Sequence, residues 1–121
     1  MGKIPNPIGP YSAYRQQGQL TFTSGQLPLD PDTGEIVGKT AYEQTKQSLH
    51  NLESVLNCED SGLDDVVKLT VFVTDIADIA EVNKAFEEVL SLPYPARSGI
   101  EVSKLPMSSK VEIEAIAATK A

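Results

Sequence analysis

The spacing of apolar residues along the chain changes between a period of two, typical of strands, and a period near 3.6, typical of helices. Residues 11 to 15 and 20 to 25 carry the short period and predict a hairpin. Residues 40 to 57 carry the long period and predict a helix, with Thr40 and Glu43 at the spacing of a capping box. The Pro- and Gly-rich segments 1 to 10 and 26 to 38 predict an extended arm and a long loop.

The second half of the chain repeats this change of period. Residues 66 to 73 form a β-branched run with little alternation, which predicts a central strand covered on both faces. A helix is predicted from residue 78 until just before Pro93, with Asp78 and Glu81 again at capping-box spacing. Two more strands are predicted, around residues 98 to 102 and 110 to 118. The order β-β-α-β-α-β-β indicates one α+β domain over residues 1 to 121.

The last predicted strand divides its side chains between two faces. We expect one set to meet the helices, namely Val111, Ile113, Ala115 and Ala117, while the other face carries Glu112, Glu114 and Ile116. Two helices cover only one face of such a sheet, so the second face requires another cover. A second copy of the chain is the simplest cover, because most soluble oligomers are built from identical chains. The pattern therefore predicts a homo-oligomer.

Composition and charge narrow the function classes. The 121 residues carry 10 Lys and Arg against 17 Asp and Glu, a net charge of −7, which disfavours nucleic acids and anionic membranes as partners. One Cys and one His exclude an internal disulfide and every multi-cysteine or two-histidine metal site. The chain has no phosphate-binding glycine motif, no apolar run of membrane-spanning length and no secretory signal pattern. We expect a cytoplasmic protein without a metal or cofactor.

One arginine and two glutamates are candidates for chemistry. Arg97 follows a proline-rigid turn, and its planar guanidinium can hold a carboxylate or phosphate through two parallel hydrogen bonds. An ordinary surface or ion-pairing arginine is the alternative, because the chain is rich in acids. Glu112 and Glu114 lie on the predicted oligomer face, where a partly desolvated carboxylate suits either acid–base chemistry or an interface salt bridge.

The remaining polar candidates have simple structural alternatives. Tyr11 suits a packing role with a satisfied hydroxyl better than catalysis. Ser24 and Gly25 end a predicted strand, where a backbone N–H can approach a ligand, although glycine also serves turns. His50 is expected to face solvent, and Cys58 stands beside acids that disfavour a thiolate. We assign no role to His50 or Cys58.

A long sequence signature in the last quarter of the chain indicates a family. It consists of PARS at residues 95 to 98, IEV at 100 to 102, LP at 105 to 106 and VEIEA at 111 to 115. Together with GPY at 9 to 11 and TSGQ at 23 to 26, it resembles the Rid family, the reactive intermediate deaminases, also called YjgF or L-PSP proteins. The resemblance covers nearly the whole chain, and Arg97 favours the arginine-bearing deaminase branch.

The resemblance implies a chorismate-mutase-like fold, a homotrimer with its sheets packed inward, and three active sites in clefts between subunits. The implied catalytic residues are Arg97, which holds the substrate, Glu112, which is associated with the attacking water, and Tyr11, which places a phenol in the cleft. The implied substrate-binding positions are Arg97, Ser24, Gly25 and Gly99. Many members have Cys in place of Gly99, so a thiol-dependent role is excluded and a wider pocket is expected.

The implied reaction is hydrolysis of 2-iminobutanoate or 2-iminopropanoate, released by pyridoxal-phosphate enzymes, to a 2-keto acid and ammonia. No metal or cofactor is required. A non-catalytic trimeric binding or regulatory protein for small carboxylates such as 2-keto acids is the alternative, and Glu112 is the residue that separates the two. An endoribonuclease or translation inhibitor is a third possibility, which the charge of −7 and the lack of a basic, aromatic patch disfavour.

Overall fold

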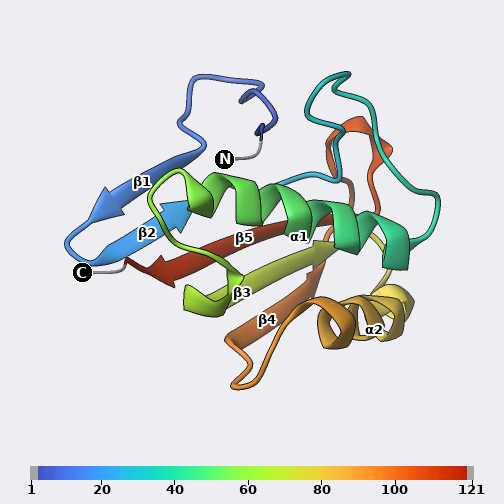
Figure 1. Cartoon of the computed structure of the whole chain (residues 1–121). Helices are drawn as coiled ribbons and strands as arrows, with labels where there is room; N and C mark the ends of the chain where they lie inside the picture. Colours follow the sequence, from blue (N-terminus) through green and yellow to red (C-terminus); the bar gives the residue numbers. More distant parts are fainter. Residues whose placement is uncertain (1–2, 120–121) are drawn as a thin grey trace.

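The computed structural model describes residues 3–119. They fold into a five-stranded sheet with two helices on one face (Figure 1). The strands run in the sheet order β1-β2-β5-β3-β4, in which β3 and β4 are parallel and the other neighbours antiparallel. The elements are β1 (Tyr14–Gln17), β2 (Leu20–Thr23), α1 (Ala41–Asn57), β3 (Val66–Val73), α2 (Ile79–Val89), β4 (Ala96–Glu101) and β5 (Val111–Ala118). This is the predicted α+β order, and both helices lie on the same face.

Helix α1 begins as its capping box predicts. The Glu43 backbone N–H donates to Thr40 Oγ1 at 3.1 Å, and the Thr40 N–H donates to Glu43 Oε1 at 3.2 Å. The apolar side of α1, including Leu49, Leu52 and Leu56, is fully buried against the sheet and α2. Neither helix of residues 3–119 is long and apolar enough to cross a membrane.

The predicted capping box of α2 is wrong. Asp78 makes no side-chain cap, and the preceding 3₁₀ turn is capped instead by Asp75, whose Oδ1 accepts from the Ala77 N–H at 2.9 Å. The carboxylate of Glu81 turns to the other helix and accepts from the Tyr42 N–H at 3.3 Å. The acid that was expected to close its own helix therefore links the start of α1 to α2.

Two predicted strand boundaries shift, and each shift moves a candidate residue. The first strand begins at Tyr14, so Tyr11 lies in the arm before it rather than in the hairpin. Arg97, expected just before a strand, is the second residue of β4, which pairs with β3 from Ala96 onward. Local sequence does not reveal a parallel partner strand, and that partner extends β4 back through Arg97.

The two faces of the sheet differ in burial. On β5 the predicted alternation is confirmed, with Val111, Ile113, Ala115 and Ala117 buried beneath the helices. On β3, Leu69, Val71 and Val73 are buried, but Lys68, Thr70 and Phe72 on the opposite face are only half-buried. Within residues 3–119 the helices cover only one face of β3, so its cover on both faces stays a prediction that depends on a second copy of the chain.

Candidate active site

Glu112 lies on the open face of the sheet, directly against Gly25. The side chain of Glu112 is half-buried on β5, and Gly25 follows the end of β2. A Cβ built on Gly25 would lie 2.8 Å from Glu112 Cδ and 3.1 Å from its Oε2, closer than real Cβ atoms approach other atoms. The carboxyl group of Glu112 therefore occupies space that any side chain at position 25 would need.

Two sets of backbone interactions hold Gly25 in this place. Gln26 forms an isolated antiparallel bridge to Ile113, with its N–H donating at 2.7 Å and its carbonyl accepting at 3.1 Å. Behind the bridge, the buried amide of Asn51 on α1 donates to the carbonyls of Leu27 and Leu29 at 3.0 and 2.9 Å. The loop after β2 is thus fixed against both β5 and α1, and Gly25 cannot move away from Glu112 without breaking these bonds.

A cavity of about 220 Å³ opens beside Glu112 under the N-terminal arm. Its lining includes Tyr11, Gly25, Pro106 and Glu112, together with Pro5 to Ile8 of the arm. The Tyr11 hydroxyl accepts a hydrogen bond from the Ile8 N–H at 3.3 Å. Ser24 does not line this cavity; its hydroxyl donates to the Ser12 carbonyl at 2.6 Å and ties the arm to the end of β2.

The surroundings of Glu112 favour its protonated form more than water would. Partial burial, and secondarily the negative charge of neighbouring Glu114, raise the pKa of Glu112 above its ordinary value. Glu114 itself is exposed on the same face of β5. A half-buried carboxylate with a raised pKa is a stronger base than an exposed one, which suits it to taking a proton from water.

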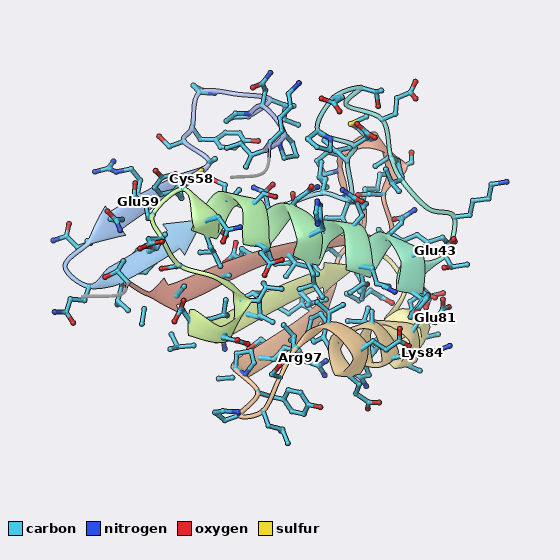
Figure 2. All side chains as sticks on the ribbon, in the orientation of Figure 1. Glu43, Cys58, Glu59, Glu81, Lys84 and Arg97 are labelled. Carbon is cyan, nitrogen blue, oxygen red and sulfur yellow. The ribbon has the colours of Figure 1, made fainter. Side chains whose placement is uncertain are left out.

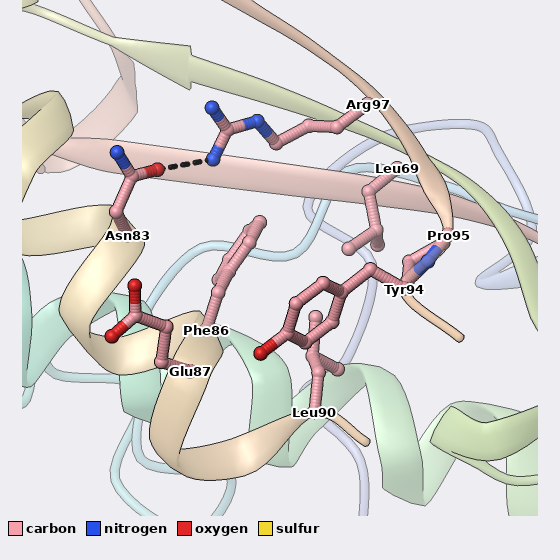
Figure 3. Close-up of a pocket in the computed structure, with 8 residues that line it drawn as sticks. All are labelled: Leu69, Asn83, Phe86, Glu87, Leu90, Tyr94, Pro95 and Arg97. Atoms are coloured by element: carbon pink, nitrogen blue, oxygen red, sulfur yellow. Dashed lines mark hydrogen bonds between the residues drawn. The ribbon is translucent and has the colours of Figure 1, made fainter. Parts of the chain in front are cut away.

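Arg97 lies on the other side of the sheet, at its β4 edge beside α2 (Figure 3). Its Nη1 donates to the amide oxygen of Asn83 at 2.5 Å, and its guanidinium carbon lies 5.6 Å from the centre of the Phe86 ring. A largely apolar cavity of about 230 Å³ adjoins it, lined by Leu69, Asn83, Phe86, Glu87, Leu90, Tyr94, Pro95 and Arg97.

Arg97 forms no ion pair within residues 3–119. The salt bridges of the described residues are Lys3–Asp32 and Lys46–Glu88, both on the surface. The alternative of an ordinary ion-pairing arginine was based on the excess of acids, and the structure places a neutral amide rather than an acid against the guanidinium. Its full charge and its remaining N–H donors are therefore available to an external anion.

Arg97 and Glu112 do not meet within one chain. Arg97 pairs in register with Leu69 on β3, and Glu112 pairs with Phe72 three positions further along the same strand. Residues directly opposite one another share a face and successive residues alternate, so Arg97 and Glu112 lie on opposite faces. They are also two strand spacings apart, about 9–10 Å. A small substrate cannot contact both side chains of the same chain.

Gly99 lies outside both cavities of the single chain, and the expectation that it widens the pocket between subunits stays a prediction. It pairs with Val71 on the face that the helices cover. A Cβ at this position would lie 3.2 Å from Ile79 Cδ1, a tighter approach than most Cβ contacts. A side chain at position 99 would therefore require the end of the Ile79 side chain to shift by a few tenths of an ångström.

His50 and Cys58 lie away from both cavities. His50 is exposed on α1, as predicted. Cys58 and Glu59 lie together at the C-terminal end of α1 (Figure 2), where the thiol donates weakly to the Ser54 carbonyl at 3.6 Å and Glu59 accepts from the Tyr14 hydroxyl at 2.6 Å. Among residues 3–119, no three His, Cys, Asp or Glu side chains are grouped so as to hold a metal ion.

The sequence did not indicate Asn83 as a residue of the candidate site. An asparagine within an amphipathic helix carries no pattern that distinguishes it from other surface polar residues. Its contact with Arg97 depends on how α2 packs beside β4, which only the folded chain reveals.

Comparisons with known proteins agree on one family. A family model described as Endoribonuclease L-PSP matches residues 1–119. The chain belongs to this L-PSP family, also called Rid or YjgF. It is 44% identical over 115 residues to a RutC family protein of Pyrococcus abyssi, covering 95% of this chain and 91% of that protein. It is 39% identical to reactive intermediate deaminase A, chloroplastic, of Arabidopsis thaliana, covering 95% of this chain and 62% of that protein.

Solved structures of L-PSP family proteins have the same fold. RidA of an Antarctic Psychrobacter superposes with a TM-score of 0.92 at 38% identity, covering 96% of this chain and 94% of that one. Escherichia coli TdcF, solved with bound serine, superposes with a TM-score of 0.89 at 38% identity and covers 98% and 94% of the two chains. The predicted family and α+β fold are thereby confirmed.

Proposed function

We propose that this L-PSP family protein is an imine deaminase of the arginine-bearing branch. It hydrolyses short 2-imino acids, such as 2-iminobutanoate and 2-iminopropanoate released by pyridoxal-phosphate enzymes, to 2-keto acids and ammonia. The observation that carries the proposal is the exposed guanidinium of Arg97, which forms no ion pair with any residue from 3 to 119 in a chain of net charge −7. A relative named reactive intermediate deaminase, at 39% identity, supports the same reaction.

The active site in this proposal lies between two subunits of a homotrimer. Arg97 of one subunit and Glu112 of the next contribute to each site, because the two residues lie on opposite faces of one sheet. The open face supports such an assembly, since it carries large apolar side chains that one chain leaves exposed, including Leu20, Phe22 and Ile100. Packing the three open faces inward buries these side chains and brings each Glu112 to the interface.

Arg97 binds the substrate in this mechanism and Glu112 activates water. The guanidinium holds the substrate carboxylate through two hydrogen bonds, which fixes the neighbouring imine carbon. Glu112 accepts a proton from water as the water oxygen bonds to that carbon, and returns the proton to the nitrogen. The hydroxyl proton of the resulting carbinolamine then passes to its nitrogen, and the carbon–nitrogen bond breaks. Ammonia leaves with the electron pair of that bond as the carbon–oxygen double bond of the 2-keto acid forms.

Four further residues shape the site in this proposal. Tyr11 closes the cavity beside Glu112 and directs a phenol toward the substrate. Gly25 leaves room for the Glu112 carboxyl group, and Ser24 holds the arm that carries Tyr11. Gly99, two residues after Arg97 on β4, offers a backbone N–H near the substrate carboxylate.

A binding protein for small carboxylates is the second candidate. The bound serine in the TdcF structure favours it, because serine is an amino acid that this reaction does not consume. Binding and hydrolysis share Arg97 and differ in their need for Glu112.

An imine-hydrolysis assay tests the proposal. An amino-acid oxidase generates 2-imino acids in situ, and semicarbazide traps whatever remains unhydrolysed. The protein should lower the semicarbazone yield, Arg97→Ala should abolish this effect, and Arg97→Lys should restore little because an ammonium lacks the planar fork. Glu112→Gln should lower turnover by a factor on the order of 10²–10⁴.

The matched control is Glu53→Gln, the same change at an exposed residue of α1. It should leave turnover unchanged. Binding of a stable 2-keto acid without any effect on imine hydrolysis would refute the deaminase proposal and leave the binding protein.

A further inference from the structure

We propose that Asn83 is a positioning residue, whose amide oxygen holds the guanidinium of Arg97 in place while leaving its positive charge unneutralised. This inference rests on the proposed function, because it takes Arg97 as the residue that binds the substrate carboxylate. It assigns a role in carboxylate binding to α2, which the sequence signature does not include.

The packing of α2 sets the direction of Asn83. Val82, Ala85 and Phe86 are the buried residues of α2, and they fix the rotation of the helix against the sheet and α1. Asn83 follows Val82 directly and is half-buried, so its side chain lies at the border between the core and the β4 edge. Figure 3 shows its amide oxygen directed at the guanidinium of Arg97.

The guanidinium is held from two directions. Asn83 accepts from Nη1 at 2.5 Å, and the guanidinium carbon lies over the Phe86 ring, 5.6 Å from its centre. Within residues 3–119 no other group accepts a hydrogen bond from this guanidinium. Nε and Nη2 therefore remain available side by side, and this pair of donors matches the two oxygens of a carboxylate.

The neutral partner is as important as the hydrogen bond. The chain has 17 acidic residues against 10 basic ones, and an acid, Glu87, lines the same cavity without bonding to Arg97. A carboxylate at position 83 would form an ion pair with Arg97 and would compete with the substrate for it. An amide oxygen orients the guanidinium and contributes no opposing charge.

A double-mutant cycle tests this role. Dissociation constants for 2-oxobutanoate, a stable 2-keto acid, and imine-hydrolysis kinetics are measured for the wild type, Asn83→Leu, Asn83→Asp, Arg97→Lys and the double variant Asn83→Leu/Arg97→Lys. Asn57→Leu serves as the matched control, because it makes the same change at the exposed last residue of α1. Asn83→Asp has nearly the shape of the native side chain and keeps the test possible if the leucine variant does not fold.

The expected result is a loss of carboxylate affinity that acts through Arg97. Asn83→Leu should weaken 2-oxobutanoate binding about 10-fold and raise KM similarly, with kcat changed less than about threefold, since a hydrogen bond to a charged group is lost. The same substitution should have little further effect in the Arg97→Lys background. Asn83→Asp should also weaken binding, because it retains an acceptor but neutralises Arg97.

Three results would overturn the inference. The first is an affinity of Asn83→Leu for 2-oxobutanoate equal to that of the control Asn57→Leu. The second is an equal loss of this affinity when Asn83→Leu is introduced into the wild type and into Arg97→Lys. The third is an Asn83→Asp variant that binds 2-oxobutanoate as tightly as the wild type. A different result would contradict the proposed function alone. In that case the wild type binds 2-oxobutanoate, Arg97→Lys weakens the binding, and no imine is hydrolysed. A wild type that binds no 2-oxobutanoate would overturn the role of Asn83 as well.

Discussion

Replacing Gly25 with alanine tests whether the position of the Glu112 carboxyl group governs turnover. The new Cβ would lie 2.8 Å from Glu112 Cδ and 3.0 Å from Cγ, whereas ordinary van der Waals contacts begin at 3.4 Å. The carboxyl group must therefore retreat by at least about 0.6 Å, since the Gln26 bridge to Ile113 prevents Gly25 from moving instead.

The effect on stability should be small. The displaced atoms belong to the far end of a flexible, half-exposed side chain, so relieving the overlap costs less than the about 1–3 kcal/mol of overpacking a rigid core. Replacing glycine by alanine also restricts the unfolded chain, which stabilises the fold by about 0.4–1 kcal/mol where the backbone permits it. These opposite effects should leave the melting temperature within about 3 °C of the wild type.

The effect on catalysis should be large by comparison. A misplacement on the order of 1 Å lowers catalytic rates by up to about 10²-fold. We expect kcat for imine hydrolysis to fall about 10- to 100-fold in Gly25→Ala, while the dissociation constant of 2-oxobutanoate changes little because Arg97 is untouched. Gly62→Ala is the matched control, because its Cβ would meet no atom within 4 Å and its φ is −144°.

A Gly25→Ala variant that keeps full turnover would refute this reasoning. It would mean that the exact place of the Glu112 carboxyl group is unimportant. A loss of turnover that only matches a loss of folded protein would also refute it, and calorimetry on the assayed preparation separates the two cases.

Four further predictions concern assembly and stability. Sedimentation should give a trimer of about 39 kDa, three times the 13.0 kDa chain, and a stable monomer at micromolar concentration would contradict it. The hydrogen bond to Glu59 raises the pKa of Tyr14 to about 12. The stability that this bond gives the fold should be fully present below the ordinary tyrosine pKa of 10.0 and should be lost as the pH rises through 12. Tyr14→Phe should remove this late phenolate step from an ultraviolet titration. Thr40→Ala should destabilise the fold by about 1 kcal/mol in urea unfolding. Backbone hydrogen bonds from Lys39 and Thr40 lower the pKa of Glu43, so Glu43→Gln should be less stable at neutral pH, and the difference should close as acid protonates the wild-type carboxylate.

The elements with local signals were predictable from the sequence. The capping box at Thr40 and the apolar stripe behind it act within a few turns of one helix, and α1 begins where they indicate. The alternation along β5 likewise assigns each side chain to a face, because the period of a strand is a property of its own backbone. The resemblance to the Rid family, carried by the residues around Arg97 and Glu112, added the family and the fold.

Predictions failed where a distant partner decides the outcome. Asp78 and Glu81 have the spacing of a capping box, but Glu81 bonds to Tyr42 on the other helix. The strand that carries Arg97 begins earlier than its own residues suggest, because pairing with β3 extends it.

The arrangement of the candidate site was decided by the tertiary structure alone. Gly25 lies against Glu112 because the Gln26 bridge joins segments from opposite ends of the chain, and Asn83 meets Arg97 because α2 packs beside β4. The register of β3 with both of its neighbours places Arg97 and Glu112 on opposite faces of the sheet. Such pairings depend on hydrogen bonds and packing between residues remote in sequence, and the pattern of any single segment carries no record of its partner.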